Sequence, residues 1–316
     1  MDIVVCTDHN YVMPCGVMLY SLCKNNAKHE INFHVVIDES VSTFDKQSLQ
    51  AIADEWNGVN LIYIPIDGHL FDNFPNLGGG MYVTKATYYR LYLSKILPQS
   101  LNKVLYLDCD MVVRKDIGEL WNTNIDNIAV AVALDGMDGL IQLYNRLAYP
   151  AGKGYFNAGM MLINLKYWRD YDVLGKCLDF IKNHYDIIVS HDQDVLNVVL
   201  QDSKVNVDIT YNFGEGFLYK PQFMQFDYYK NREAIERVIH DPAIVHYTIS
   251  KPWKEGCLNP FKSVFFAYIS KTEWRDFKLE KTKYTKRELL KKCLYKIRLI
   301  HRELVNPFIT IDFELN

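Results

Sequence analysis

The chain lacks several patterns that would assign it to a common class of protein. Its seven cysteines are odd in number and include no C-x-x-C pair, so neither a disulfide framework nor a zinc site is indicated. No stretch approaches the roughly 18 apolar residues of a membrane-spanning helix, and the start carries no basic leader with a long apolar core. We therefore expect the protein to be made and kept in the cytoplasm without spanning a membrane.

Two phosphate-binding motifs are also missing. The sequence contains neither G-x-x-x-x-G-K-[ST] nor G-x-G-x-x-G, which argues against a P-loop kinase and a dinucleotide dehydrogenase. What the chain does have is 49% apolar content over 316 residues, with 22 Tyr and 16 Phe, enough to bury a large core. We predict one large domain over residues 1–265 and a C-terminal appendage over 266–316.

Alternating apolar strands and amphipathic helices indicate an α/β fold. Strands are predicted over 3–6, 31–38, 59–66, 104–107, 128–134 and 243–247, and helices over 14–25, 42–56, 84–97, 172–183 and from 191. The order of the first elements favours parallel pairing and a nucleotide-binding half. In such sheets ligands lie beyond the carboxyl ends of the strands, so Asp8, Asn10 and Tyr11 are placed to meet a base or ribose. A polar turn that caps the next helix is an equally good interpretation of these residues.

The stretch from Lys103 to Arg114 is the one around which we interpret the rest. The apolar run ending at Leu107 suits a buried strand, and Asp108 and Asp110 follow it directly. Residues two apart on an extended chain share a face, so both carboxylates can address one ion. A hard cation such as Mn²⁺ or Mg²⁺ bridging to a diphosphate fits two oxygen ligands and implies a nucleotide substrate. Asp-x-Asp alone also occurs by chance as a solvated turn.

Further residues suit such a substrate, and some of them also have a simpler interpretation. The amide of Asn157 can both donate to and accept from sugar hydroxyls. Asp192 suits hydroxyls or developing positive charge, or merely caps a helix. His246 can supply the imidazole that favours Mn²⁺, although a lone histidine after a strand is more often structural, and Lys251 can neutralise diphosphate charge. The general exposure of arginine favours a surface position for Arg90.

Taken together, these residues resemble glycosyltransferase family 8. The matching motifs are Val104-Leu-Tyr-Leu-Asp-Cys-Asp110, Tyr155-Phe-Asn-Ala-Gly159 with Asn164-Leu165, Asp192-Gln-Asp194, and His246-Tyr247 before Lys251-Pro-Trp253. Their order and spacing over about residues 1–260 are similar to those of bacterial lipopolysaccharide or lipooligosaccharide galactosyl- and glucosyltransferases, with glycogenin a more distant relative. The resemblance implies a GT-A fold, with a mostly parallel Rossmann-like sheet flanked by helices and a small C-terminal helical appendage. It also implies retaining transfer of glucose or galactose from a UDP-sugar.

The resemblance further assigns roles by position. Mn²⁺, with Mg²⁺ as the alternative, would be held by Asp108, Asp110 and His246. The uridine would meet Asp8, Asn10 and Tyr11, with Tyr11 stacking on uracil, and Thr7 and Cys109 belong to the same donor-binding group. Arg90, Asp135, Asn157, Asp192 and Gln193 would surround the donor sugar, and Lys251 would contact the diphosphate.

Retention requires either a nucleophile on the β face of the sugar or a front-face attack guided by the leaving phosphate. The family position nearest the anomeric carbon matches the amide of Gln193, so we favour front-face transfer and keep Asp194 as a candidate nucleophile. One motif departs from the family. Its usual form is His-[Phe/Tyr]-x-Gly-x-x-Lys-Pro-Trp, but here the loop from His246 to Lys251 is one residue shorter and has no glycine. We expect Lys251 to approach the diphosphate differently.

The positive charge is concentrated near the C-terminus. Residues 278–302 contain ten Lys or Arg and two Glu, whereas the whole chain has a net charge of -3. Apolar residues there recur at helical spacing, at Leu290, Cys293, Leu294, Ile297, Ile300 and Leu304. We interpret Arg287–Leu304 as a basic amphipathic helix, and we expect residues 278–304 to contact an anionic membrane surface at the inner face of the cell membrane. A helix docked on its own domain is the alternative.

Two other classes of function share parts of this pattern. A nucleotidyltransferase that makes the sugar nucleotide would use the same kind of α/β domain, but this chain lacks a Gly-rich loop with basic residues near its start. A non-catalytic protein that binds nucleotide sugars or glycans is the third candidate. We favour the transferase, with a glycan or lipid-linked glycan as acceptor and no nucleic-acid partner. Glucose and galactose differ in the orientation of one hydroxyl, so the sequence favours neither donor.

Overall fold

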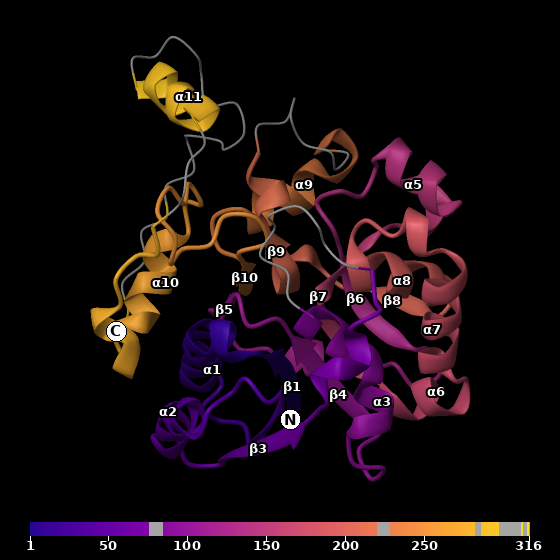
Figure 1. Cartoon of the computed structure of the whole chain (residues 1–316), viewed down its shortest axis with the longest axis horizontal. Helices are drawn as coiled ribbons and strands as arrows, with labels where there is room; N and C mark the ends of the chain where they lie inside the picture. The colour runs from indigo at the N-terminus through magenta and orange to yellow at the C-terminus, as the bar shows by residue number, and fades with distance from the viewer. Residues whose placement is uncertain (76–84, 220–227, 282–285, 297–310, 312–314, 316) are drawn as a thin grey trace.

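The computed structural model describes residues 1–75, 85–219, 228–281, 286–296, 311 and 315, and the structural statements that follow refer to these residues. A seven-stranded sheet forms the centre of the molecule (Figure 1). Its strands are β1 (Asp2–Thr7), β2 (Ile31–Ile37), β3 (Val59–Pro65), β4 (Lys103–Leu107), β6 (Val130–Leu134), β7 (Phe156–Asn164) and β8 (Lys204–Asn206), in the order β3-β2-β1-β4-β7-β6-β8. A second sheet contains β5 (Met111–Val113), β10 (Ile244–His246) and β9 (Phe213–Gly214), in that order.

The large sheet is mostly parallel, as predicted. Only β7 runs antiparallel to its neighbours, β4 and β6. All the other adjacent pairs are parallel. The sequence analysis treated the segment around Asn157 as a motif and did not predict β7. It also missed β5, β8 and β9, because strands of two or three residues carry too few alternations to be recognised.

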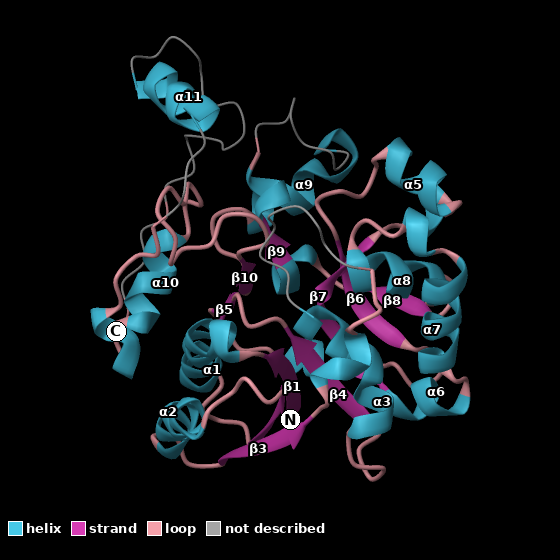
Figure 2. Ribbon diagram, viewed as in Figure 1, coloured by secondary structure: helices cyan, strands magenta, loops and turns pink. Residues whose placement is uncertain are grey.

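Helices lie on both sides of this sheet, and α11 lies apart from it (Figure 2). They are α1 (Val12–Asn25), α2 (Thr43–Asp54), α3 (Leu93–Ile96), α4 (Gly118–Trp121), α5 (Ile141–Leu147), α6 (Leu165–Asp170), α7 (Val173–Asn183), α8 (His191–Val199), α9 (Tyr228–Val238), α10 (Lys262–Ile269) and α11 (Lys286–Lys296). The predicted helix over 84–97 is instead a 3-10 helix, Lys85–Tyr92, followed by the short α3. Its aromatic side chains, among them Tyr88 and Tyr89, are buried in the core, and this tertiary packing overrides the local helical pattern.

The sheet divides the apolar core into two parts. In β1, Ile3 and Val5 belong to one cluster and Val4 and Cys6 to the other, as the alternation of side chains along a strand requires. Helices α1 and α2 cover the first face, and α3, α6, α7 and α8 cover the second (Figure 1). With both faces covered, the end of the sheet is the place left for a ligand.

The segment after β10 packs on the first face of the sheet. Phe265 and Tyr268 of α10 are buried in the same cluster as α1, and Asn25 donates a hydrogen bond of 2.7 Å to the Tyr268 hydroxyl. The predicted boundary between residues 265 and 266 falls inside α10, and the division into two domains stays a prediction. No helix among the described residues is long and apolar enough to cross a membrane. Of the predicted tail helix, residues 297–304 lie outside the described residues.

Candidate functional site

A cavity of about 570 Å³ opens at the ends of β1, β4, β6 and β10. It is lined by all but two of the residues that the sequence analysis assigned to a site, namely Thr7, Asp8, Tyr11, Arg90, Asp108, Cys109, Asp110, Asp135, Asn157, Asp192, Gln193, His246 and Lys251. The two that do not line it are Asn10 and Asp194. Segments more than 200 residues apart in sequence therefore meet in one place. The parallel strands β1, β4 and β6 end at the same edge of the large sheet, and β10 of the small sheet ends beside them.

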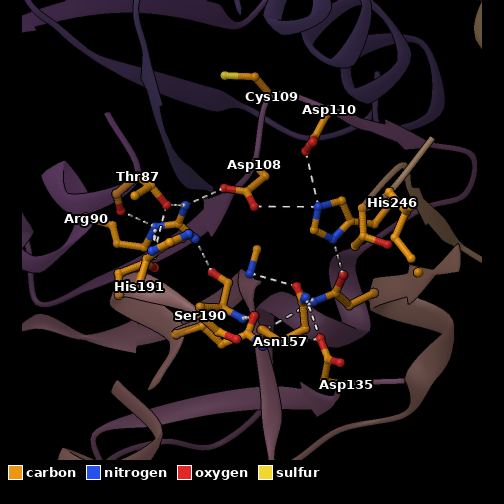
Figure 3. A pocket seen from close by; sticks show the side chains of 18 of the residues that line it. Thr87, Arg90, Asp108, Cys109, Asp110, Asp135, Asn157, Ser190, His191 and His246 are labelled. Atoms are coloured by element: carbon orange, nitrogen blue, oxygen red, sulfur yellow. Dashed lines mark hydrogen bonds and ion pairs between the residues drawn. The ribbon is translucent and has the colours of Figure 1, made fainter. Parts of the chain in front are cut away.

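Asp108, Asp110 and His246 converge in this cavity (Figure 3). One ligand atom from each lies within 4.8 Å of the other two. His246 Nε2 is 3.1 Å from Asp110 Oδ1 and 3.5 Å from Asp108 Oδ2. The two carboxylates follow β4, and the imidazole ends β10 of the small sheet. The arrangement of the three groups is that of a candidate metal centre.

The hydrogen bonding of His246 supports this assignment. Its Nδ1 lies 2.8 Å from Asn212 Oδ1, and the Asn212 amide nitrogen donates to the side-chain oxygen of Asn157 at 3.0 Å. The amide oxygen of Asn212 therefore faces the ring and accepts from the Nδ1–H, which leaves Nε2 on the side of the two carboxylates, where its lone pair would meet a bound cation. Three acceptors aimed at one point fit a divalent cation, and an orienting partner behind a metal-binding histidine is typical of such sites. No motif identified Asn212, which ends the 3-10 helix Ile209–Asn212 directly before β9.

Gly159 makes this convergence possible. A Cβ atom on Gly159 would lie 2.3 Å from His246 Cε1 and 2.6 Å from Asp108 Oδ2, both far inside van der Waals contact. Its carbonyl oxygen also accepts a 2.8 Å hydrogen bond from the Asp108 N–H. The absence of a side chain on Gly159 therefore lets two metal-site side chains approach its backbone closely.

Arg90 is buried, with 5% of its surface exposed, so the interpretation of it as an ordinary surface residue is wrong. Its guanidinium lies 2.9 Å from Asp108 Oδ1 and 3.1 Å from Asp192 Oδ2. It also donates a 2.7 Å hydrogen bond to the carbonyl oxygen of Ala158 and lies over the ring of Tyr106. Two cavity carboxylates require a buried cation, which outweighs the general tendency of arginine to be exposed. Burial nevertheless raises the pKa of Asp192 to about 6, because Arg90 only partly offsets it.

A cluster of polar groups lies beside the metal centre. The Asn157 amide donates to Asp135 Oδ2 at 2.7 Å, and the Gln193 amide donates to the same oxygen at 3.4 Å. The side-chain oxygen of Gln193 accepts a 3.1 Å hydrogen bond from the Ala158 N–H. Burial raises the pKa of Asp135 despite these hydrogen bonds. The cluster presents donors and acceptors of the kind that sugar hydroxyls require.

Asp194 does not line the cavity and is fully buried. Its carboxylate accepts hydrogen bonds from both terminal nitrogens of Arg146, at 2.7 and 3.1 Å, from the Tyr155 hydroxyl at 2.7 Å and from the Ser190 N–H at 2.8 Å. These contacts hold the start of α8 in place. Neither Asp194 nor the exposed Asn10 is brought to the cavity.

Tyr11 also lines the cavity, and its ring meets the Trp253 ring edge-on with centroids 5.9 Å apart. Asp8 accepts a 2.9 Å hydrogen bond from the Asn10 N–H and so caps the 3-10 helix His9–Tyr11, while it also lines the cavity. Helix α1 has no side-chain cap, so the interpretation of this turn as the cap of that helix is wrong. The thiol of Cys109 is directed away from the metal centre (Figure 3). The ring of Tyr11 offers a surface on which a base can stack.

Lys251 closes the site beside Asp110. Its ammonium group contacts Asp110 Oδ2 and donates a 2.6 Å hydrogen bond to the Tyr247 carbonyl oxygen. Burial alone would raise the pKa of Asp110, but Lys251 and His246 hold it below its usual range. The cation is therefore placed at the metal centre even though its loop is shorter than expected.

Comparison with known proteins agrees with this geometry. The family model described as glycosyl transferase family 8 matches residues 2–257. The chain is similar to general stress protein A of Bacillus subtilis, with 30% identity over 87% of this chain and 94% of that protein. It is also similar to the lipopolysaccharide glucosyltransferase WaaO of Escherichia coli, with 28% identity over 93% of this chain and 87% of that one. Among solved structures, a galactosyltransferase, LgtC, in complex with donor and acceptor sugar analogs superposes with a TM-score of 0.77 at 26% identity, covering 87% of this chain and 99% of that chain.

Proposed function

This chain belongs to glycosyl transferase family 8, and from that premise we propose that it transfers glucose or galactose from a UDP-sugar to a glycan hydroxyl with retention of configuration. The observation that carries the proposal is the meeting of a three-ligand metal centre and a cluster of polar groups in one cavity. A nucleotide sugar has a diphosphate for the first and hydroxyl groups for the second. The ring of Tyr11, which lines the same cavity, would stack on the base.

Asp108, Asp110 and His246 would hold Mn²⁺, with Mg²⁺ as the alternative. When bound, the ion would supply Lewis-acid stabilisation of the diphosphate leaving group. The ammonium of Lys251 adds a second positive charge at the same place, so no proton donor to the leaving group is required. Arg90 keeps Asp108 and Asp192 in position, because its guanidinium lies near both carboxylates.

The donor sugar would lie against Asp135, Asn157 and Gln193. We favour front-face transfer, in which the leaving phosphate guides the acceptor and the amide oxygen of Gln193 stabilises developing positive charge at the anomeric carbon. Asp194 was the candidate nucleophile for double displacement. Its four hydrogen bonds to Arg146, Tyr155 and Ser190 argue against that role.

Replacement of Gln193 tests the mechanism. Gln193→Ala should lower kcat by about 100-fold while the KM for the donor changes little, because a contact made mainly in the transition state affects turnover more than binding. The measurement is steady-state transfer at saturating Mn²⁺, with Asp194→Asn as a second variant. Full turnover in Gln193→Ala with unchanged donor binding would rule out the assigned role.

UDP release tests the function itself. The purified protein should liberate UDP from UDP-glucose or UDP-galactose in the presence of Mn²⁺, and release should rise when a glycan acceptor is added. A nucleotidyltransferase would instead form the sugar nucleotide from a sugar phosphate and a nucleoside triphosphate, and a binding protein would release nothing. The absence of UDP release from every UDP-sugar, with and without glycan acceptors, would contradict the proposal.

The acceptor that we propose is a surface glycan or its lipid-linked precursor. One similar protein is named a lipopolysaccharide glucosyltransferase, and a similar structure was solved with an acceptor sugar analog. Residues 278–304, with their excess of positive charge, would bring the enzyme to the anionic inner face of the membrane, where a lipid-linked acceptor resides. We accordingly propose a cytoplasmic protein with peripheral membrane contact.

A further inference from the structure

The loop between His246 and Lys251 is held by Glu215, a residue that belongs to no recognised motif. Glu215 begins the 3-10 helix Glu215–Leu218, directly after β9, and only 3% of it is exposed. Strand β9 pairs in parallel with β10, with Gly214 opposite His246. Glu215 is therefore placed next to the chain that leaves β10 and leads to Lys251.

Hydrogen bonds on both sides join Glu215 to that loop. One carboxylate oxygen of Glu215 accepts from the Ser250 N–H at 2.8 Å, and the other accepts from the Ser250 hydroxyl at 2.7 Å. In the opposite direction, the Glu215 N–H donates to the Thr248 hydroxyl at 3.2 Å. Because backbone and side chain of Ser250 bind the two oxygens of one carboxylate, the residue before Lys251 is fixed in both position and orientation.

Gly216, the residue after Glu215, packs against the loop that follows Asp135. A Cβ atom on Gly216 would lie 3.0 Å from the Gly136 Cα, and one on Gly136 would lie 2.8 Å from the Gly216 Cα, so the two backbones touch. Gly136 follows Asp135, which forms part of the cavity wall. The 3-10 helix that carries Glu215 therefore contacts the loop that carries Lys251 on one side and the loop that follows Asp135 on the other.

These contacts explain how the loop between His246 and Lys251 keeps a fixed shape although it is short. The family's usual loop contains a glycine, whose backbone freedom shapes it, whereas this loop is one residue shorter and has none. Here the Ser250 N–H donates a hydrogen bond to the Glu215 carboxylate, and the Thr248 N–H donates one of 3.0 Å to the His246 carbonyl oxygen. The shape of the loop is therefore imposed from outside, by a buried carboxylate on a neighbouring segment.

We propose that Glu215 is a positioning residue for donor binding, which acts through Ser250 to set Lys251 toward the diphosphate. The inference rests on the proposed function, since it takes the donor to be a nucleoside diphosphate sugar. It assigns to Glu215 no contact with the substrate. Its effect belongs mainly to the affinity for UDP and for the donor, because the ammonium of Lys251 would face the diphosphate already in the bound donor, and only a smaller part belongs to the chemical step.

Variants that remove different parts of the contact between Glu215 and Ser250 test the proposal. Glu215→Ala should raise the KM for the donor and the Kd for UDP with Mn²⁺ by about tenfold, equal to about 1.4 kcal/mol of binding free energy. Ser250→Ala, which keeps the backbone hydrogen bond, should raise both by about threefold, since one neutral-to-charged hydrogen bond is lost. Glu215→Gln keeps one acceptor oxygen and should fall between wild type and Glu215→Ala. The value of kcat should stay within about threefold throughout.

A double-mutant cycle and a matched control separate positioning from plain stability. Glu215→Ala combined with Ser250→Ala should bind UDP no more weakly than Glu215→Ala alone, because the second change removes a contact already lost. Glu280→Ala is the control, because this glutamate pairs with Lys254 at 3.2 Å, three residues beyond Lys251, and does not line the cavity. It should leave the Kd for UDP unchanged.

Two outcomes would overturn the proposal. One is a Kd for UDP that is unchanged in Ser250→Ala and in Glu215→Ala, even if thermal stability falls. The other is a fall in kcat as large as the rise in KM. Because calorimetry with UDP and Mn²⁺ needs no turnover, it tests Glu215 even if the wild-type protein releases UDP from no donor, a result that would contradict the proposed function instead.

Discussion

At the scale of single residues, the site combines groups whose charge depends on their neighbours. Asp192 is the clearest case, because its carboxylate lines the cavity and yet lies in a buried environment that raises its pKa to about 6. Arg90, 3.1 Å away, offsets the cost of burial only in part. The ionised form that would receive a sugar hydroxyl therefore predominates only above that pH.

This pKa gives a prediction with a defined sign. The kcat/KM for the donor should fall about tenfold per pH unit below pH 6, and Asp192→Asn should lower activity and remove this limb. For folding the sign is opposite: with a pKa raised from 3.8 to about 6, the carboxylate opposes folding above pH 6 by about 3 kcal/mol, a cost relieved as the pH falls toward 4. Transfer rates at saturating Mn²⁺ and urea unfolding from pH 4 to 8 measure both. An acid limb that persists in Asp192→Asn would contradict the assignment.

Asn212 gives a second prediction at this scale. Removing its amide should leave the proton of His246 Nδ1 without an acceptor and free the ring to rotate, so Asn212→Ala should weaken Mn²⁺ binding by about 10- to 100-fold. Calorimetry or electron paramagnetic resonance with Mn²⁺ alone, without donor, measures this directly. Asn60→Ala, which removes an exposed amide remote from the cavity, should bind Mn²⁺ like the wild type. Equal affinity in both variants would show that Asn212 does not orient the ligand.

At the scale of elements, the C-terminal segment is fastened to α1 through a glycine. The ring of Trp274 lies over Gly16, where a Cβ atom would be 2.1 Å from the ring carbon Cζ3. Trp274 also packs against the same apolar cluster as α1 and α10. The sequence suggested an appendage after residue 265, but these contacts join the segment to the first face of the main sheet.

Filling that position should be costly although alanine favours helices. Gly16→Ala gains about 1 kcal/mol of helix propensity, but the overlap with Trp274 should produce a net destabilisation of about 1–3 kcal/mol. The combined variant with Trp274→Ala should be less unstable than the sum of the two single changes, because the overlap is then gone. Urea unfolding measures the cycle. Gly152→Ala serves as the control, because a Cβ there meets nothing within 4 Å. Strict additivity would show that the ring does not press on α1.

At the scale of the whole molecule, the distribution of charge distinguishes the tail from the body. Residues 278–302 carry ten basic residues against two acidic ones in a chain whose net charge is negative. Juxtamembrane basic residues contribute about 1 kcal/mol each to the attraction to an anionic surface. The chain contains other exposed lysines, so the effect of where a positive charge lies can be separated from the effect of the total charge.

Charge reversal tests the membrane proposal. Lys291→Glu with Lys292→Glu should lower binding of the full-length protein to vesicles containing anionic lipid by at least about tenfold at low salt, and neutral vesicles should bind neither form. The same reversal at Lys176 and Lys182, two exposed residues of α7, changes net charge equally and should leave vesicle binding nearly intact. Co-sedimentation measures both. Equal loss in the two double variants would remove the assignment to the tail.

The sequence by itself determined the α/β order, the two carboxylates after a buried strand and the family, because these depend on spacing along one stretch of chain. Tertiary structure decided what each residue faces. It buried Arg90 between Asp108 and Asp192 and turned Asp194 away from the cavity toward Arg146. It also brought Asn212 to His246 at the end of β10, and Glu215 to the loop that carries Lys251. A carboxylate two residues from another shares its face only while the chain is extended, whereas contacts between distant loops depend on how the strands and helices pack.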